Sequence, residues 1–233
     1  EYTACGLIGL GVERGHAVAV LAPTSYEWLL LDLALLSIGA ITVPIYESDS
    51  AAQIEHILTD AHVTRVFTAT TQQAELVHSV APEYTVAVDS FDRGAQRMIA
   101  RAATGITITN VEQRRAAISS SDIATIIYTS GTTGEPKGVV ITHANFREMM
   151  RIHTLRLPMV TERDLSMCFL PLVHIFEKGW TNFCLCRGVR IAINRDPKMI
   201  RQTLLEVRPT LMCNVPRFWE KVYAGANERL TRA

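Results

Sequence analysis

The sequence predicts an α/β fold with mostly parallel sheets flanked by helices. Short runs rich in β-branched residues alternate with stretches of helical periodicity along most of the 233 residues. Turn and capping signals separate them: Ser25 precedes the helix predicted over 26–39, and Gly39 ends it. A strand–helix–strand rhythm of this kind makes consecutive strands parallel and places their helices on both faces of the sheet.

The first part of the chain supplies a series of strand–helix repeats after an initial helix at residues 2–10. The predicted strands are 17–22, 41–46, 65–69 and 84–88. The predicted helices between them are 26–39, 51–61 and 71–81. Ser50 is a candidate N-cap for the second of these helices. Residues 90–120 are less regular, and we expect a helix and a loop there.

A second series follows. Its predicted strands are 164–170, 189–193 and 210–215, and its predicted helices are 175–186, 197–207 and 216–230. Pro197 suits the first turn of its helix. We therefore expect two sheet subdomains, residues 1–160, which end in a hairpin, and residues 161–233, which begin a second subdomain.

Composition excludes some classes of protein. The 23 basic residues balance 23 acidic ones, so no nucleic-acid partner is expected. The longest apolar stretch, 28–41, contains Asp32 and is too short to span a bilayer. The five cysteines form no C-x-x-C pair, which favours reduced thiols over a zinc site or a disulfide framework. With no signal peptide visible, we expect a cytoplasmic protein.

The most distinctive segment is Y-T-S-G-T-T-G-E-P-K-G at 128–138, between apolar runs at 123–128 and 139–141. Glycines let backbone N–H groups turn inward, hydroxyls add donors and lysine adds charge, which together suit a polyphosphate. The segment is not a Walker A loop, because Pro136 stands at the second glycine position and β-branched residues follow Lys137 where a helix is required. We predict a phosphate loop between two strands; a plain glycine-rich turn is the alternative.

The same residues carry a resemblance. T-S-G-T-T-G-E-P-K-G-V at 129–139 resembles the signature loop of the adenylate-forming (AMP-binding) superfamily, and T-H-A-N at 142–145 fits its continuation. F-L-P-L-V-H-I-F-E at 169–177 and V-P-R-F-W-E-K-V at 215–222 resemble segments of the long-chain fatty acyl-CoA synthetase branch. The resemblance covers the whole chain. It implies the N-terminal part of the large domain of an ATP-dependent fatty acid–CoA ligase.

The resemblance also implies a set of site residues. ATP-binding residues would be Thr129, Ser130, Gly131, Thr132, Thr133, Gly134 and Lys137. The Thr129 hydroxyl would also touch Mg²⁺, and CoA would be the co-substrate. His174 would be catalytic, lining the pocket beside the acyl carboxylate and the α-phosphate; a helix-capping or core histidine is the alternative. Glu177 and Lys178 are expected to be structural, because adjacent helical residues point to different faces.

The chain departs from the family in what it lacks. The family's Y-G-x-T-E and T-G-D segments, its hinge and its C-terminal catalytic lysine do not occur in it. We therefore expect the chain alone to be inactive. An adenylating enzyme for another carboxylic acid and a non-catalytic nucleotide-binding fragment remain alternatives. Fatty acid and ATP are the expected partners, while peripheral membrane association and oligomer formation are left open.

Overall fold

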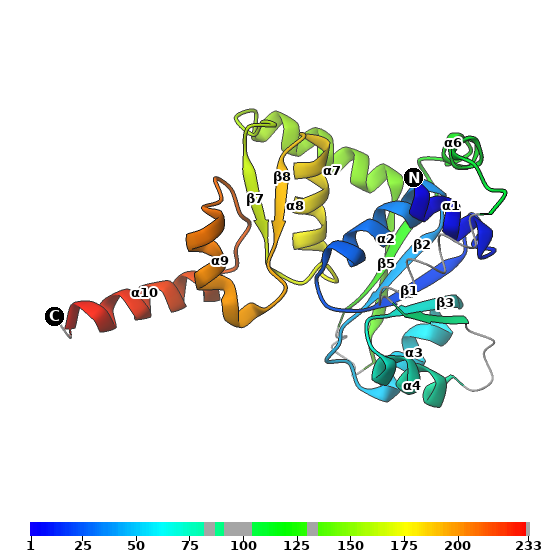
Figure 1. The fold of residues 1–233 in the computed structure, drawn as a ribbon, viewed down its shortest axis with the longest axis horizontal. Coiled ribbons are helices and arrows are strands. Elements are labelled where there is room, and N and C mark those ends of the chain that lie inside the picture. Colours follow the sequence, from blue (N-terminus) through cyan, green and yellow to red (C-terminus); the bar gives the residue numbers. More distant parts are fainter. Residues whose placement is uncertain (82–86, 91–103, 130–134, 232–233) are drawn as a thin grey trace.

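The computed structural model describes residues 1–81, 87–90, 104–129 and 135–231, and it shows the predicted α/β architecture (Figure 1). A six-stranded sheet has the order β4-β3-β1-β2-β5-β6, and β7 and β8 form a second sheet. Neighbouring strands run parallel except β5 and β6, which are antiparallel. The strands are β1 (Ala17–Leu21), β2 (Ile41–Ile45), β3 (Val63–Thr68), β4 (Ala87–Ser90), β5 (Ile123–Thr129), β6 (Lys137–Thr142), β7 (Leu165–Cys168) and β8 (Arg190–Ile193).

Helices cover both faces of the large sheet (Figure 1). Val18 and Val20 of β1 pack toward α1 and α2, whereas Ala19 and Leu21 pack toward α3 and α4. Because both sets are buried, β1 is an uninterrupted apolar run, as expected for an inner parallel strand. The helices are α1 (Tyr2–Gly9), α2 (Tyr26–Ser37), α3 (Ala51–Asp60), α4 (Thr71–Val80), α6 (Ile108–Ala116), α7 (His143–Arg156), α8 (Ile175–Cys186), η1 (Pro197–Met199), α9 (Ile200–Val207) and α10 (Pro216–Thr231).

Local signals set several of these boundaries. The Ser25 hydroxyl accepts a hydrogen bond from the Trp28 amide at 3.1 Å and so starts α2. At α3, Ser50 and Gln53 form a reciprocal capping box. Residues 84–86 of the predicted strand 84–88 lie outside the described residues, and β4 begins at Ala87.

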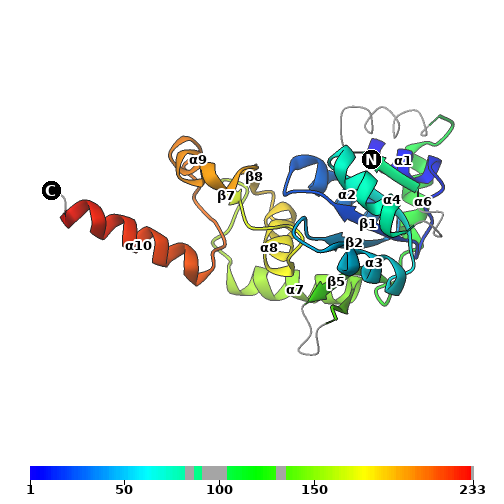
Figure 2. The same cartoon turned by 90° about the horizontal axis from the view of Figure 1, so that it is seen from below.

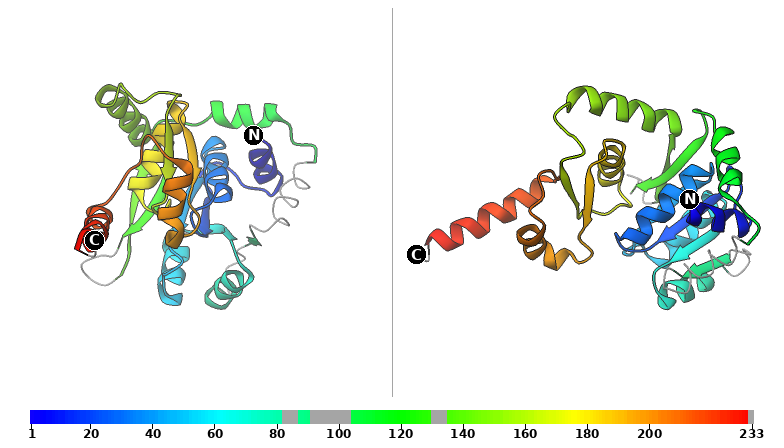
Figure 3. Two further views of the ribbon diagram at one scale, coloured as in Figure 1. Left: turned by 60° about the vertical axis from the view of Figure 1, so that its left-hand side comes forward. Right: turned by 45° about the horizontal axis from the view of Figure 1, so that its top comes forward.

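Helix α7 was not predicted, and it joins the two sheets (Figure 3). The side chains of Thr142 and Asn145 form the capping box that begins it. Met150 on α7 packs on the cluster around Phe183 and Val189 of the second sheet region. Helix α7 ends before residue 160 but contributes to the core of the second sheet region. The boundary between residues 1–160 and 161–233 stays a prediction.

The strand predicted at 210–215 is wrong. Only an isolated bridge between Leu211 and Ser166 forms there. A strand needs a partner along its length, and β7 spans only Leu165–Cys168. Residues 212–215 have no strand assignment, and the chain turns from them into α10.

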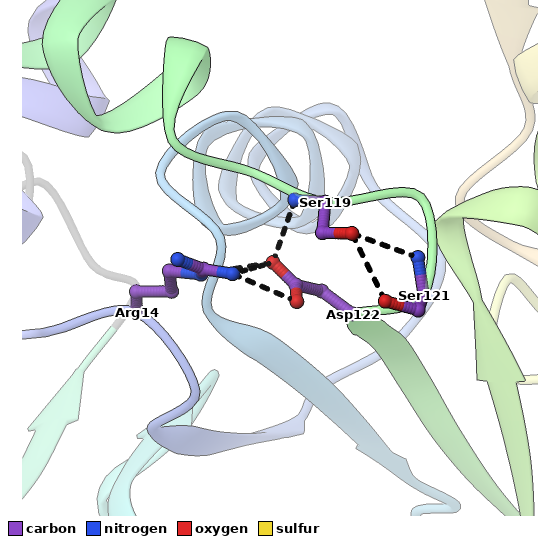
Figure 4. A network of polar contacts seen from close by, with 4 residues as sticks. All are labelled: Arg14, Ser119, Ser121 and Asp122. Carbon is purple, nitrogen blue, oxygen red and sulfur yellow. Dashed lines mark hydrogen bonds and ion pairs between the residues drawn. The ribbon is translucent and has the colours of Figure 1, made fainter.

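The start of β5 is fixed by a polar network (Figure 4). The Arg14 guanidinium donates to both carboxylate oxygens of Asp122, at 2.8 and 2.9 Å. The Ser119 amide also donates to Asp122, at 2.9 Å, and its hydroxyl lies 2.9 Å from that of Ser121. The hydrogen bonds from the Arg14 guanidinium and the Ser119 amide hold the pKa of Asp122 below its usual range, and the Arg14 charge adds to the effect. This network ties the loop before β1 to the strand that leads into the predicted phosphate loop.

The C-terminal helix α10 extends away from both sheets (Figure 2). Its aromatic residues Trp219 and Tyr223 are 58% and 70% exposed. Among the described residues, no helix combines the length and the apolar character needed to cross a membrane.

Candidate functional site

The predicted phosphate loop connects the two antiparallel strands of a hairpin. Thr129, the last residue of β5, pairs with Lys137, the first of β6. Because a strand rather than a helix begins at Lys137, the Walker A alternative is excluded. Residues directly opposite each other in an antiparallel pair present their side chains on the same face. The side chains of Thr129 and Lys137 therefore leave the backbone on the same face of the hairpin. Five predicted residues lie outside the described residues: Ser130, Gly131, Thr132, Thr133 and Gly134.

A cavity of about 400 Å³ lies where β5 ends. Thr129 and His174 both line it, although 45 positions separate them in the sequence. Tyr46 and Asp49, from the segment that follows β2, form part of its wall. Ligands of open α/β sheets bind outside the carboxyl ends of parallel strands, and β2 and β5 both end here. The fold thus brings together two of the residues that sequence analysis selected.

Lys137 lines a second cavity, of about 630 Å³, together with His56, Asp60 and Glu135. Pro136 lines both cavities. The ammonium group is therefore not placed among the residues around His174. The distance from the Lys137 side chain to a nucleotide bound beside His174 therefore depends on the position of the hairpin.

His174 is the N-cap of α8. Its Nδ1 accepts a hydrogen bond from the Phe176 amide at 3.1 Å, so the proton of the neutral ring is on Nε2. Upstream, the Leu172 amide donates to the Thr24 hydroxyl at 3.0 Å, which attaches this loop to the segment after β1. The capping interpretation is thus correct, and the same histidine still lines the cavity.

Below His174, α8 carries two fully buried ionic side chains. Glu177 accepts hydrogen bonds from the Leu170 amide and the Thr181 hydroxyl, both at 3.1 Å. Burial raises the pKa of Glu177, and its hydrogen bonds oppose that shift. The Lys178 ammonium pairs with Asp32 at 2.6 Å. Both residues hold α8 in place, in line with the structural role expected from the sequence.

Sequence analysis missed the wall contributed by Tyr46, Asp49 and Gln53. The Asp49 carboxylate accepts the Tyr46 amide at 3.0 Å. Burial raises the pKa of Asp49, and it also raises the pKa of Tyr46, with a further contribution from the Asp49 charge. The signal was available, because Asp49 follows the predicted strand 41–46, and ligands of α/β sheets bind outside the carboxyl ends of parallel strands.

Comparisons with known proteins identify the family of the chain. A family model described as AMP-binding enzyme matches residues 1–232. The long-chain-fatty-acid–CoA ligase FadD15 of Mycobacterium bovis is 35% identical over 236 residues, covering 99% of this chain and 39% of that protein. Long chain acyl-CoA synthetase 3 of Arabidopsis thaliana is 29% identical over 245 residues, covering 95% of this chain and 36% of that protein. The chain therefore spans well under half the length of these relatives.

Solved structures show the same fold. ATP-bound MatB from Rhodopseudomonas palustris superposes with a TM-score of 0.77 at 23% identity, over 94% of this chain and 44% of that one. O-succinylbenzoate coenzyme A synthetase (MenE) from Bacillus subtilis, in complex with ATP and magnesium ion, gives 0.78 at 21% identity, over 94% and 43%. Because the AMP-binding enzyme model matches residues 1–232, the chain belongs to the AMP-binding enzyme family.

Proposed function

We propose that this chain is the N-terminal portion of an ATP-dependent long-chain fatty acid–CoA ligase that uses Mg²⁺. The observation that carries the proposal is the cavity shared by Thr129 and His174 at the carboxyl ends of β2 and β5. The choice of a fatty acid and of CoA is supported by the names of the relatives FadD15 and long chain acyl-CoA synthetase 3.

The proposed reaction has two steps. A carboxylate oxygen of the fatty acid attacks the α-phosphorus of ATP, the bond to the bridging oxygen breaks, and pyrophosphate leaves. The CoA sulfur then attacks the acyl carbon, and AMP leaves as the thioester forms. Charge moves onto the leaving pyrophosphate in the first step, so donors and cations around the phosphates stabilise that transition state.

The hairpin supplies those groups. We assign phosphate binding to Thr129, Ser130, Gly131, Thr132, Thr133, Gly134 and Lys137. The Thr129 hydroxyl is an exposed oxygen at the end of β5, the type of ligand that Mg²⁺ prefers. A single contact of this kind fits Mg²⁺, which takes most of its other ligands from phosphate oxygens and water. The bound ion would neutralise phosphate charge.

His174 is assigned to the reacting centre. With Nδ1 engaged by the Phe176 amide, the Nε2–H group is left as a donor for a carboxylate or an α-phosphate oxygen. The N-terminus of α8 adds a favourable dipole for an anion at the same place. One side chain therefore both caps the helix and presents a donor to the cavity.

A simple assay tests whether this chain alone catalyses the reaction. The purified chain is mixed with ATP, oleate and CoA, and AMP release and acyl-CoA are measured. We expect no acyl-CoA from the chain alone, because the family's lysine and T-G-D segments are absent from this sequence. Correct placement of reacting groups accounts for roughly 7–11 kcal/mol of a barrier, so a half-built site gives no measurable rate. Acyl-CoA above a heat-killed control would contradict this expectation.

The proposal itself is tested by pyrophosphate exchange in the full-length parent, varying ATP and fatty acid separately. Lys137→Ala removes a charge-assisted contact worth about 1.5–3 kcal/mol, so kcat/KM for ATP falls roughly ten- to a hundredfold. Lys198→Ala, at an exposed lysine of η1, is the matched control. His174→Ala instead slows adenylation with little change in pyrophosphate affinity. An unchanged kcat/KM for ATP in Lys137→Ala would show that the hairpin does not bind the phosphates.

A further inference from the structure

Helix α3 contacts both arms of the hairpin. On the first arm, the Tyr128 hydroxyl donates to the Asp60 carboxylate at 2.5 Å. On the second arm, Nε2 of His56 lies 2.9 Å from the carbonyl oxygen of Pro136 and donates to it. His56 and Asp60 are four residues apart, so they lie on the same face of α3. One helical face thus holds two strands that run in opposite directions.

The two hairpin residues that α3 contacts each precede a proposed phosphate-binding residue. Tyr128 immediately precedes Thr129, and Pro136 immediately precedes Lys137. Thr129 and Lys137 are the two described residues to which the proposed function assigns phosphate contacts. Each contact from α3 is therefore one residue from a group that would meet the nucleotide.

Packing directs Tyr128 toward α3. Tyr128 and Gly138 are cross-strand partners, and the phenol ring crosses the space where a side chain at Gly138 would stand. A Cβ built at Gly138 would lie 3.1 Å from Cζ of Tyr128 and 2.9 Å from Cγ2 of Ile126. The rings of His56 and Tyr128 are also in edge-to-face contact, with centroids 6.1 Å apart. A side chain at position 138 would therefore crowd the ring that reaches Asp60.

We propose that His56 and Asp60 are positioning residues that fasten the two arms of the phosphate-binding hairpin to α3 and so set the placement of Thr129 and Lys137. The inference rests on the proposed function for the identity of the ligand. An O–H donor to a carboxylate is among the stronger hydrogen bonds, and its short length fits that class. Burial raises the pKa of Tyr128, and the bond to Asp60 raises it further, so the phenol stays a donor at neutral pH.

The advantage is geometric. Ordering a free chain segment costs conformational entropy. Because α3 holds both arms, Thr129 and Lys137 have less freedom to lose when they contact a ligand. Phosphate contacts displaced by about an ångström lose much of their effect on rate.

The experiment uses the full-length parent and measures two quantities. Deuterium exchange of the β5 and β6 amides reports whether α3 holds the hairpin, and calorimetric titration with Mg·ATP reports affinity. Tyr128→Phe and Asp60→Ala should each speed exchange in β6 and weaken Mg·ATP binding about tenfold, with no further loss in the double variant. Asp60→Asn keeps an acceptor for the phenol and should recover most of the affinity. His56→Leu should weaken binding several-fold.

Matched controls separate positioning from general damage. Tyr2→Phe changes a tyrosine of α1 that is 81% exposed, and His78→Leu changes an exposed histidine of α4; both should leave exchange and affinity unchanged. Exchange in β5 and β6 that is unaltered by Tyr128→Phe and Asp60→Ala overturns the inference. Faster exchange with unaltered affinity also overturns it, because the contact is then structural only. A wild-type full-length parent that binds no Mg·ATP contradicts the proposed function instead, and the exchange data then still decide whether α3 holds the hairpin.

Discussion

The Lys178 ammonium lies 2.6 Å from a carboxylate oxygen of Asp32, and neither side chain is more than 1% exposed. The pair joins α8, which packs on the second sheet, to α2, which covers the first. The ammonium also stands 5.4 Å from the centroid of the Trp28 ring. His174 begins the helix that Lys178 anchors, so this contact fixes one wall of the candidate site relative to the large sheet.

Removing one partner of this pair should be costly. Lys178→Met leaves the Asp32 carboxylate buried without its counter-ion, and we expect the free energy of unfolding to fall by about 3–5 kcal/mol. Urea denaturation followed by circular dichroism measures it. In the double variant Asp32→Leu/Lys178→Met most of the loss should be recovered, because no unpaired charge remains. The exposed pair Glu148–Arg151 provides the control: Arg151→Ala should cost less than about 1 kcal/mol. Equal losses of unfolding free energy in Lys178→Met and Arg151→Ala would contradict the prediction.

Two glycines should respond in opposite directions to alanine. At Gly138 a Cβ would meet Ile126 at 2.9 Å, so Gly138→Ala should lower the free energy of unfolding by about 1–3 kcal/mol. At Gly225, inside α10, a Cβ would have no neighbour within 4 Å, and Gly225→Ala should stabilise the helix by about 0.5–1 kcal/mol. Thermal denaturation of both variants checks the two signs. A neutral Gly138→Ala would mean that the Tyr128 ring does not need this space.

Only one cysteine should react in the folded chain. Cys186 is exposed, whereas Cys5, Cys168, Cys184 and Cys213 are buried. Burial raises the pKa of Cys184 to about 11, and burial also raises the pKa of Cys168 and of Cys213. Because the thiolate is the nucleophile, iodoacetamide at neutral pH should add once per chain, and five times in urea. Mass spectrometry counts the adducts, and Cys186→Ser should abolish the single addition. A second rapid addition would contradict the burial of the other four thiols.

Glu177 should make stability depend on pH. Burial raises its pKa in the folded chain above the value in the unfolded chain, so the folded chain keeps the proton longer. That contribution to stability is fully present below the unfolded pKa, about 4.3, and is lost as pH rises through the folded pKa. From about pH 4 upward, wild type should therefore lose stability relative to Glu177→Gln, as measured by urea denaturation at several pH values. Glu75→Gln, on the exposed face of α4, should run parallel to wild type. Parallel curves for Glu177→Gln would show that this pKa is not raised.

Much of the fold could be predicted because its signals are local. The helix predicted at 175–186 matches α8, and the strands at 17–22 and 41–46 match β1 and β2 to within one residue. Capping residues, glycines and β-branched runs act over a few residues, so they are legible in the sequence. Helix α7 was not predicted, although the capping box of Thr142 and Asn145 that begins it is equally local.

The sequence by itself determined the chemistry of the hairpin: hydroxyls, glycines and a lysine between two strands, which no packing could create or remove. Only the tertiary structure decided which residues meet. Thr129 and His174 share a cavity because the buried Asp32–Lys178 pair holds α8, which His174 caps, against α2 of the large sheet, beside the end of β5. Asp60 reaches Tyr128 across 68 positions because α3 packs beside β5. The failed strand at 210–215 has the same cause, since a strand depends on hydrogen bonds to a partner that is distant in the sequence.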